Sequence, residues 1–447
     1  MRNIDLTQLS ARDAIREMDA GRLTSRTLVD ALLERIAKRD ADVGAFAHLD
    51  PGKVRAGADA ADRSRASGEP QGSLSGVPVA VKDIIDTADY PTESGTPVFA
   101  GRQPAENAAI VQQLKAAGAI IFGKTVTTEL AFFGPGKTRN PHNLLHTPGG
   151  SSSGSAAAVA DFQVPLAIGT QTAGSIIRPA SYCGVIGFKP TFGYVSRTGV
   201  LPQSAPLDTI GGYARTVGDI ALLLDVISRF DFADRDMIPG TKPSLAAALA
   251  DPVQRAPRFA FVRSPAWPLA DRDAQRAYEK FAASFGALAE VVDSPLPPEF
   301  DGSLRLQQIV QFSDIAKNYG PIADANPTVM SQKLKDIIAE GRSFSSADYA
   351  AALAERDPLY DALRPLLVNY DAILTPAAPG AALKGLESTG APSFNALWTY
   401  LGMPCISLPI LKVDGMPLGV QAVGARGSDP HLLRMADWLM HSAVAAS

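Results

Sequence analysis

The first forty residues carry apolar side chains at helical spacing. Leu28, Leu32, Leu33 and Ile36 recur on one side of such a helix, and basic residues follow towards its end. This spacing predicts an amphipathic helix. The next stretch, residues 51–75, is small and polar, and it predicts a helix followed by a loop.

Strands alternate with helices along most of the remaining chain. The β-branched stretch 76–82 predicts a short strand, and the stretch 104–124 predicts a helix followed by a strand. Further helices are predicted at 155–162, 216–229, 271–286 and 429–443, and further strands at 164–168, 258–263, 289–293, 371–375, 404–411 and 417–423. Such alternation favours an α/β fold, with a layered sheet covered by helices on both faces.

The same pattern predicts one compact domain spanning residues 1–447. Its expected parts are an N-terminal helical segment (1–75), a core that carries the motifs described below (76–230), a helical insertion without clear strands (about 300–370) and the C-terminal part of the core (371–447). No repeat, low-complexity tract or linker separates them. The helix at 216–229 opens with Thr216 and Asp219, which resemble a variant of the capping box.

Composition and charge exclude several classes of protein. The 447 residues include 42 basic and 46 acidic ones, which gives a formal net charge of -4, and no basic cluster is interleaved with aromatic residues. We therefore expect no binding of nucleic acid. The charged start of the chain and its short apolar runs predict neither a secretory signal nor a membrane span. Cys183 and Cys405 suit a reducing compartment better than a structural disulfide, so a cytoplasmic protein is expected.

The first candidate for chemistry is Lys82, at the end of the strand predicted for 76–82. By alternation it shares a face with Pro78 and Ala80, which are small and uncharged. A lysine acts as a base only when it is neutral; its free pKa is about 10.4, and burial can lower this by roughly 3–5 units. On its position alone Lys82 would be interpreted as a solvent-exposed lysine.

A loop dense in small residues, Gly169–Ser175, follows a later predicted strand. In such a loop the backbone N–H groups of Thr172, Ala173, Gly174 and Ser175 could converge on one point and stabilise a developing negative charge. An ordinary glycine turn is the alternative interpretation.

A second loop rich in Gly and Ser, Gly149–Ser155, leads into an alanine-rich helix. It lacks the Gly-Lys-Ser/Thr ending of a P-loop, so it is a weak candidate for nucleotide binding. It also satisfies G-x-S-x-G around Ser152, with His431 and His441 later in the chain. That motif needs a strand directly before it, and here residues 146–149 intervene.

Together, the lysine and the two loops indicate a serine nucleophile that is activated without histidine. An amide is a poor electrophile, so its cleavage requires a nucleophile, a proton acceptor and donors for the oxyanion. The sequence supplies a candidate for each of these functions, which favours acyl transfer at an amide carbonyl.

The chain resembles the amidase signature family over most of its length. The matching motifs are Val81–Asp83, Thr138–Pro141, Pro148–Ser152, Gly187–Thr191, Leu207–Gly211, Gly402–Pro404 and Pro417–Gln421. The resemblance implies the fold of that family, with a large mixed β-sheet core covered by helices, and a Ser–cisSer–Lys triad that uses no metal or cofactor.

The resemblance also implies a role for each matching residue. Ser175 would be the nucleophile that forms the acyl-enzyme. Ser151, after a cis peptide bond with Gly150, would bridge Ser175 to the terminal base Lys82. Thr172–Ser175 would supply the oxyanion hole, and Gly150 together with Arg178 would contact the substrate.

Four departures from the family pattern concern the same loops. Ser153 and Ala173 stand where glycine is usual, Gln171 stands where aspartate is usual, and the arginine after the nucleophile is three positions on, at Arg178. The last feature resembles the malonamidase-type branch, in which that arginine holds a substrate carboxylate. The alternative is that Arg178 forms a salt bridge with a neighbouring acid and only stiffens the loop.

The expected function is therefore a metal-independent amidohydrolase acting on a small amide, plausibly one that bears a carboxylate. Two alternatives are the amidase subunit of a tRNA-dependent amidotransferase, which would need partner subunits and an ammonia channel, and a non-catalytic binding relative. A homodimer is an open possibility. His142 and His146 lie between prolines without further ligands, so no metal is expected. The aromatic residues Phe394, Trp398 and Tyr400 are candidates for the pocket or the core.

Overall fold

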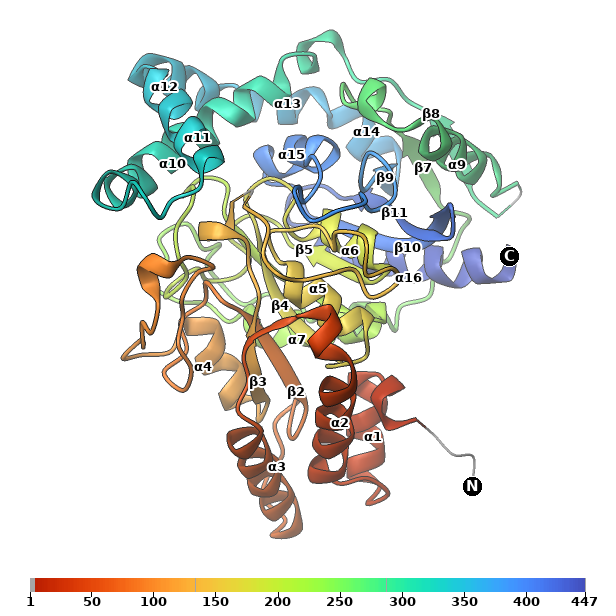
Figure 1. Ribbon diagram of the computed structural model, residues 1–447. Coiled ribbons are helices and arrows are strands. Elements are labelled where there is room, and N and C mark those ends of the chain that lie inside the picture. The colour runs from red at the N-terminus through yellow and green to blue at the C-terminus, as the bar shows by residue number, and fades with distance from the viewer. Residues whose placement is uncertain (1–4, 133, 287, 447) are drawn as a thin grey trace.

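The computed structural model describes residues 5–132, 134–286 and 288–446, and it places a large sheet at the centre of the molecule (Figure 1). Within the described residues the strands are β1 (Phe46–His48), β2 (Pro78–Lys82), β3 (Ile120–Thr125), β4 (Leu166–Gln171), β5 (Ile186–Lys189), β6 (Thr209–Ala214), β7 (Arg258–Phe261), β8 (Glu290–Asp293), β9 (Ala372–Pro376), β10 (Cys405–Val413) and β11 (Met416–Val423). They form one 11-stranded sheet in the order β1-β3-β2-β4-β6-β5-β10-β11-β9-β7-β8.

The sheet is mixed, as the family resemblance implied. Its two ends are largely parallel: β2 pairs in parallel with β3 and β4, and β7 with β8 and β9. The strands between them, β4, β6, β5, β10, β11 and β9, pair antiparallel with their neighbours. The parallel pair β2 and β4 is the one that positions the candidate site, because the carboxyl ends of parallel neighbours lie at the same edge of a sheet.

Helices cover both faces of the sheet. The described helices are α1 (Ala11–Asp19), α2 (Ser25–Val43), α3 (Pro51–Ala66), α4 (Ala109–Ala116), α5 (Ser153–Ala160), α6 (Ile177–Cys183), α7 (Val217–Ile227), α8 (Leu245–Ala248), α9 (Arg272–Ala283), α10 (Ser303–Ala325), α11 (Gln332–Ser343), α12 (Ser346–Ala354), α13 (Arg356–Ala362), α14 (Arg364–Asn369), α15 (Ser393–Tyr400) and α16 (Asp429–Ala446). The pair α5 and α6 packs on one face, while α7, α8 and α16 contact one another on the other (Figure 1). The helices of the described residues are too short or too polar to traverse a lipid bilayer.

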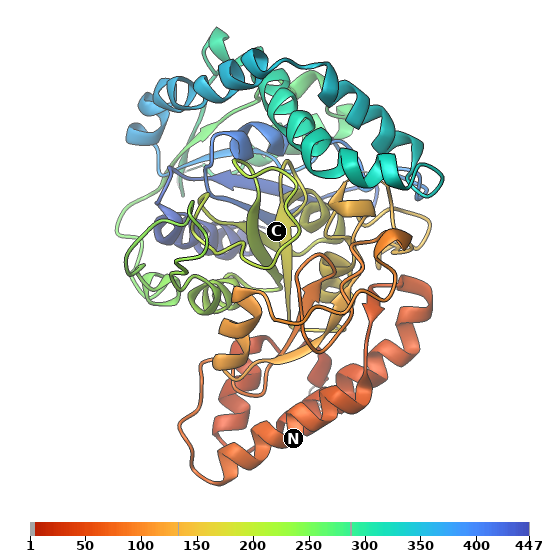
Figure 2. The same cartoon turned by 90° about the vertical axis from the view of Figure 1, so that its left-hand side faces the viewer.

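Two helical groups extend from opposite ends of the sheet core. The N-terminal helices α1, α2 and α3 lie at one end, and α10, α11 and α12 form a group at the other, as both views show (Figures 1 and 2). The latter group confirms the prediction that the chain between about 300 and 370 is helical without strands. Cys183 and Cys405 are buried free thiols, which confirms the prediction against a structural disulfide.

Several elements were not predicted from the sequence. Strands β1, β5 and β6 and helices α6 and α15 were missed. Strand β6 contains Gly211 and Gly212, and glycine is depleted in strands because it loses much backbone entropy and offers no side chain to pack. Here glycine is required, because a Cβ on Gly211 would lie 2.0 Å from the carbonyl oxygen of Phe188 on the neighbouring strand.

The capping box predicted at 216–219 is only half present. The Thr216 hydroxyl accepts a hydrogen bond from the backbone N–H of Asp219 at 3.1 Å, as expected for an N-cap. The Asp219 carboxylate, however, accepts hydrogen bonds from the N–H groups of Ala11 and Arg12, at the start of α1. Asp219 therefore joins two helices that are distant in sequence.

Candidate active site

The parallel pairing of β2 with β4 brings Lys82 beside the loop that follows β4. Val79 pairs with Leu166 and Val81 with Ile168, so Lys82, at the end of β2, lies level with the last residues of β4. The loop Thr172–Ser175 begins directly after Gln171, where β4 ends. A separation of about ninety residues in sequence is thus closed by the sheet register.

Lys82 is fully buried, and its Nζ donates to two hydroxyl oxygens. The distances are 2.8 Å to Ser151 Oγ and 2.7 Å to Thr170 Oγ1. Burial lowers the pKa of Lys82 well below its usual range, because removal from water disfavours the charged amine, while the negative charge of Asp208 opposes this effect. The interpretation of Lys82 as a solvent-exposed lysine is therefore wrong.

Ser151 follows a cis peptide bond between Gly150 and Ser151, as the resemblance implied. Its hydroxyl is nearly buried and receives the Lys82 hydrogen bond. Ser175 lies with Ser151 on the wall of one small pocket, together with Ala173, Gly174 and Arg178. The structure thus gathers the three predicted triad residues, and the proton path from Ser175 through Ser151 remains a prediction.

The neighbouring Ser152 does not have the setting of a nucleophile. It is fully buried, and its Oγ donates to the carbonyl oxygen and accepts from the N–H of Thr170, each at 3.2 Å. Its hydroxyl therefore ties the start of α5 to strand β4. The G-x-S-x-G interpretation of this loop is not supported by that position.

The loop Thr172–Ser175 holds its carbonyl groups on partners outside the pocket. Ala173 O accepts from Thr399 Oγ1, Gly174 O from the N–H of Arg178, and Ser175 O from the hydroxyl of Tyr213. The N–H groups of Ala173, Gly174 and Ser175 donate to no acceptor among the described residues. Free N–H groups beside a candidate nucleophile are what stabilisation of an oxyanion requires.

Gln171 takes a role for which an aspartate would be too short and lacks a donor. Its Oε1 accepts from the N–H groups of Ile176 and Ile177 at the start of α6, at 2.8 and 3.0 Å. Its Nε2 donates to Thr399 Oγ1 at 2.8 Å, and this hydroxyl in turn donates to Ala173 O. One amide therefore connects the end of β4, the start of α6 and helix α15.

Arg178 is buried, and two of its nitrogens are occupied by backbone carbonyls. Nε donates to Thr389 O and Nη2 to Gly150 O, each at 2.7 Å. Nη1 is buried and has no hydrogen-bond partner among the described residues, and no acidic side chain among them pairs with the guanidinium. The alternative in which Arg178 forms a salt bridge with a neighbouring acid is therefore wrong. Burial lowers the pKa of Arg178 to about 10.

The remaining pocket wall comes from segments far from the motifs. Gln311 on α10 and Thr389 and Pro392 before α15 complete it. No sequence motif marks these three residues. Trp398 and Tyr400, by contrast, are fully buried and pack in a hydrophobic cluster, so they belong to the core.

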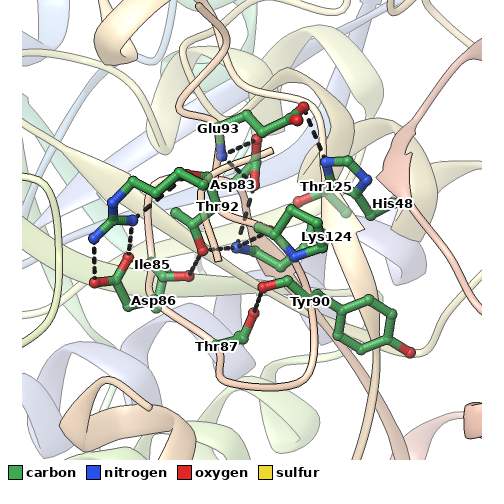
Figure 3. A network of polar contacts seen from close by, with 12 residues as sticks. His48, Asp83, Ile85, Asp86, Thr87, Tyr90, Thr92, Glu93, Lys124 and Thr125 are labelled. Atoms are coloured by element: carbon green, nitrogen blue, oxygen red, sulfur yellow. Dashed lines mark hydrogen bonds and ion pairs between the residues drawn. The ribbon is translucent and has the colours of Figure 1, made fainter. Parts of the chain in front are cut away.

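A buried ion pair supports the strand end next to Lys82. Lys124 on β3 lies 3.2 Å from Asp83, and its Nζ also donates to Thr92 Oγ1 and to Pro91 O (Figure 3). Burial lowers the pKa of Lys124 to about 8, against the effect of Asp83. Since Asp83 follows Lys82 directly, this pair helps to fix the backbone that carries the candidate base.

We expect Lys124→Met to destabilise the protein by about 3–5 kcal/mol, because it leaves the Asp83 carboxylate buried without its cation. Urea unfolding followed by circular dichroism measures the change. The double variant Asp83→Asn, Lys124→Met removes both charges and should recover part of the loss. A stable single variant would contradict this view of the pair.

Comparison with protein families relates these features to known proteins. The family model described as Amidase matches residues 27–433. A subunit of the glutamyl-tRNA(Gln) amidotransferase of Salinispora arenicola is 32% identical over 477 residues, which covers 97% of this chain and 96% of that protein. The corresponding protein of Anaeromyxobacter sp. (strain K) is 34% identical over 473 residues, with 97% and 96% covered.

Solved structures share the fold over nearly the whole chain. The peptide amidase of Stenotrophomonas maltophilia has a TM-score of 0.83 and 29% identity, with 97% of each chain covered. An inhibitor-bound complex described as revealing the origins of an s-triazine catabolic enzyme has a TM-score of 0.89 and 28% identity, with 97% of this chain and 98% of that chain covered. The family model, the relatives and the shared fold agree with the motifs and the site: the chain belongs to the Amidase family, whose members include hydrolases of carbon–nitrogen bonds.

Proposed function

We propose that this protein is an amidohydrolase that cleaves the half-amide of a short dicarboxylic acid through a seryl acyl-enzyme. Ser175 attacks the amide carbonyl, and its proton passes through Ser151 to Lys82 and then to the leaving amine. The free N–H groups of residues 173–175 receive the oxyanion, and water releases the acid.

The observation that carries this proposal is the unpaired Nη1 of Arg178. A buried guanidinium nitrogen without a partner is costly, and an anionic ligand would satisfy it with a charge-assisted hydrogen bond. Nη1 lies 2.9 Å from the position that a Cβ on Gly174 would occupy, and Gly174 precedes Ser175. A carboxylate bound there would be close to the acyl carbon, which favours a short acyl chain.

Replacing Arg178 with alanine tests the substrate class. We expect KM for a carboxylated amide to rise by roughly 10–100-fold, the equivalent of about 1.5–3 kcal/mol for a hydrogen bond to a charged group. KM for the neutral amide of the same length should change little. Steady-state kinetics on both substrates measures the difference.

The two bonds from Arg178 to Thr389 O and Gly150 O provide the internal control. If these bonds were the whole role of Arg178, both substrates would be affected equally. Arg178→Lys keeps the charge but loses the forked geometry, so it should fall between the wild type and the alanine variant.

A second candidate function is that of an amidase component in a tRNA-dependent amidotransferase. Identities of 32% and 34% to subunits of such enzymes over nearly the full chain favour it. The two proposals differ in what the isolated chain does. Turnover of short half-amides by the purified protein alone supports the hydrolase, whereas activity that appears only with partner subunits supports the amidotransferase.

A further inference from the structure

Asp208 carries an unusual buried carboxylate next to the candidate site. Oδ1 accepts a hydrogen bond from Thr172 Oγ1 at 2.5 Å, and Oδ2 accepts from the N–H groups of Gln203 and Ser204 at 2.8 and 2.9 Å. No cation among the described residues forms an ion pair with it. A carboxylate held by neutral donors, without a salt bridge, keeps its charge available to its surroundings.

Sheet register places Asp208 opposite the start of the candidate oxyanion loop. Gln171 on β4 pairs with Thr209 on β6, so the residues just beyond this pair, Thr172 and Asp208, face each other where the two strands separate. The hydrogen bond between them therefore ties the loop Thr172–Ser175 to the turn at 203–208. This tie is independent of the Gln171–Thr399 connection on the other side of the loop.

A cavity of about 220 Å³ joins Asp208 to the surroundings of Lys82. Thr170, Thr172 and Asp208 all line it, and the Thr170 hydroxyl accepts a hydrogen bond from Lys82 Nζ. Ala131 lines both this cavity and the pocket of Ser175. Asp208 thus lies on the Lys82 side of the loop, and the substrate pocket lies on the other side.

The charged and titratable groups around Asp208 come from three parts of the fold. They are Lys82 on β2, Arg197 in the chain after β5 and Tyr319 on α10. Arg197 is already paired with Asp234 and Asp236. Burial raises the pKa of Asp208 to about 6, and its negative charge raises the pKa of Lys82 against the effect of burial.

We propose that Asp208 is a positioning residue of the candidate active site, which holds Thr172 at the start of the oxyanion loop and places a negative charge on the Lys82 side. This inference rests on the proposed function, since it assigns Asp208 to the reaction of Ser175. It explains why a carboxylate without a cation is retained beside the loop.

The test is the pH dependence of Asp208→Asn. Asparagine can accept from the N–H groups of Gln203 and Ser204 and donate to Thr172, so the fold should persist, while the charge is lost. Removing that charge lowers the pKa of Lys82 and removes the titration of Asp208. The acid limb of kcat/KM for a short half-amide, and of Ser175 labelling by a fluorophosphonate, should therefore move to lower pH by on the order of one unit.

Variants of Thr172 separate the two parts of the proposal. Thr172→Val cuts the tie but keeps the Asp208 charge, so kcat should fall about tenfold without the shift in pH, in keeping with the sensitivity of oxyanion stabilisation to geometry. Thr172→Ser keeps the hydroxyl and should recover most of that loss. Asp236→Asn, an exposed carboxylate, controls for the change in net charge and should leave the midpoint in place.

Each outcome decides between the proposals. A wild-type protein that neither turns over half-amides nor becomes labelled at Ser175 overturns both the proposed function and the role of Asp208. An active wild type, together with an Asp208→Asn variant that loses activity at an unchanged midpoint, overturns only the inference on Asp208. Circular dichroism and thermal unfolding confirm that each variant is folded.

Discussion

Replacing Ser175 with alanine is expected to reduce turnover by roughly 10⁴-fold or more and to abolish covalent labelling by a fluorophosphonate. The hydroxyl that this change removes is the predicted nucleophile, and no second hydroxyl takes its place at residue 175. Ser175 lies beside N–H groups that are free to stabilise an oxyanion, so the loss concerns bond making itself. Steady-state kinetics and intact-protein mass spectrometry measure the two effects.

Ser152→Ala is the matched control for this experiment. Ser152 lies in the same part of the fold, but its hydroxyl bonds only to the backbone of Thr170. We expect this variant to be labelled at Ser175 and to lose about 1 kcal/mol of stability, the usual contribution of a hydrogen bond. Labelling of Ser175→Ala at the wild-type rate would refute the assignment of the nucleophile.

Replacing Lys82 with methionine is expected to lower kcat/KM by on the order of 10²–10⁴-fold, the range for loss of a general base. Methionine preserves most of the buried volume and removes the amine that bonds to Ser151. In the wild type the amine must be neutral to accept a proton, so activity should rise as pH increases through the pKa of Lys82. Burial lowers that pKa well below its usual range, which extends activity towards neutral pH.

In the Lys82→Met variant this rise with pH should be replaced by a partial recovery at high pH, where hydroxide can take the proton. Lys189→Met serves as the control, because Lys189 is also a fully buried lysine but donates to Pro190 O, outside the candidate pocket. It should retain the pH profile of the wild type. Full activity of Lys82→Met at neutral pH would exclude a base role for Lys82.

Much of the fold could be predicted from local patterns. The apolar spacing of α2 and the β-branched stretch of β2 were recognised because each is decided by neighbours within a few residues. The missed strand β6 shows the limit of this reasoning. Gly211 and Gly212 are poor strand formers, and their place in the sheet is decided by the close approach of the neighbouring backbone.

The candidate site divides in the same way. Lys82, Ser151 and Ser175 were identified because each lies in a short motif. The same motifs also contain Thr170 and Asp208, whose contacts with Lys82 and Thr172 become apparent only when β2, β4 and β6 are adjacent. Gln311 and Thr389 carry no motif, and only the packing of α10 and of the segment before α15 brings them to the pocket.

The sequence by itself thus determined the class of chemistry, an activated serine at an amide carbonyl, and the α/β character of the chain. Both depend on residue types at short spacing, which local physical chemistry constrains. Only the tertiary structure decided that Lys82 is buried, that Arg178 has an unpaired nitrogen beside Gly174, and that Asp208 faces Thr172. Burial and partnership depend on segments far apart in sequence, so they are fixed by packing and sheet register.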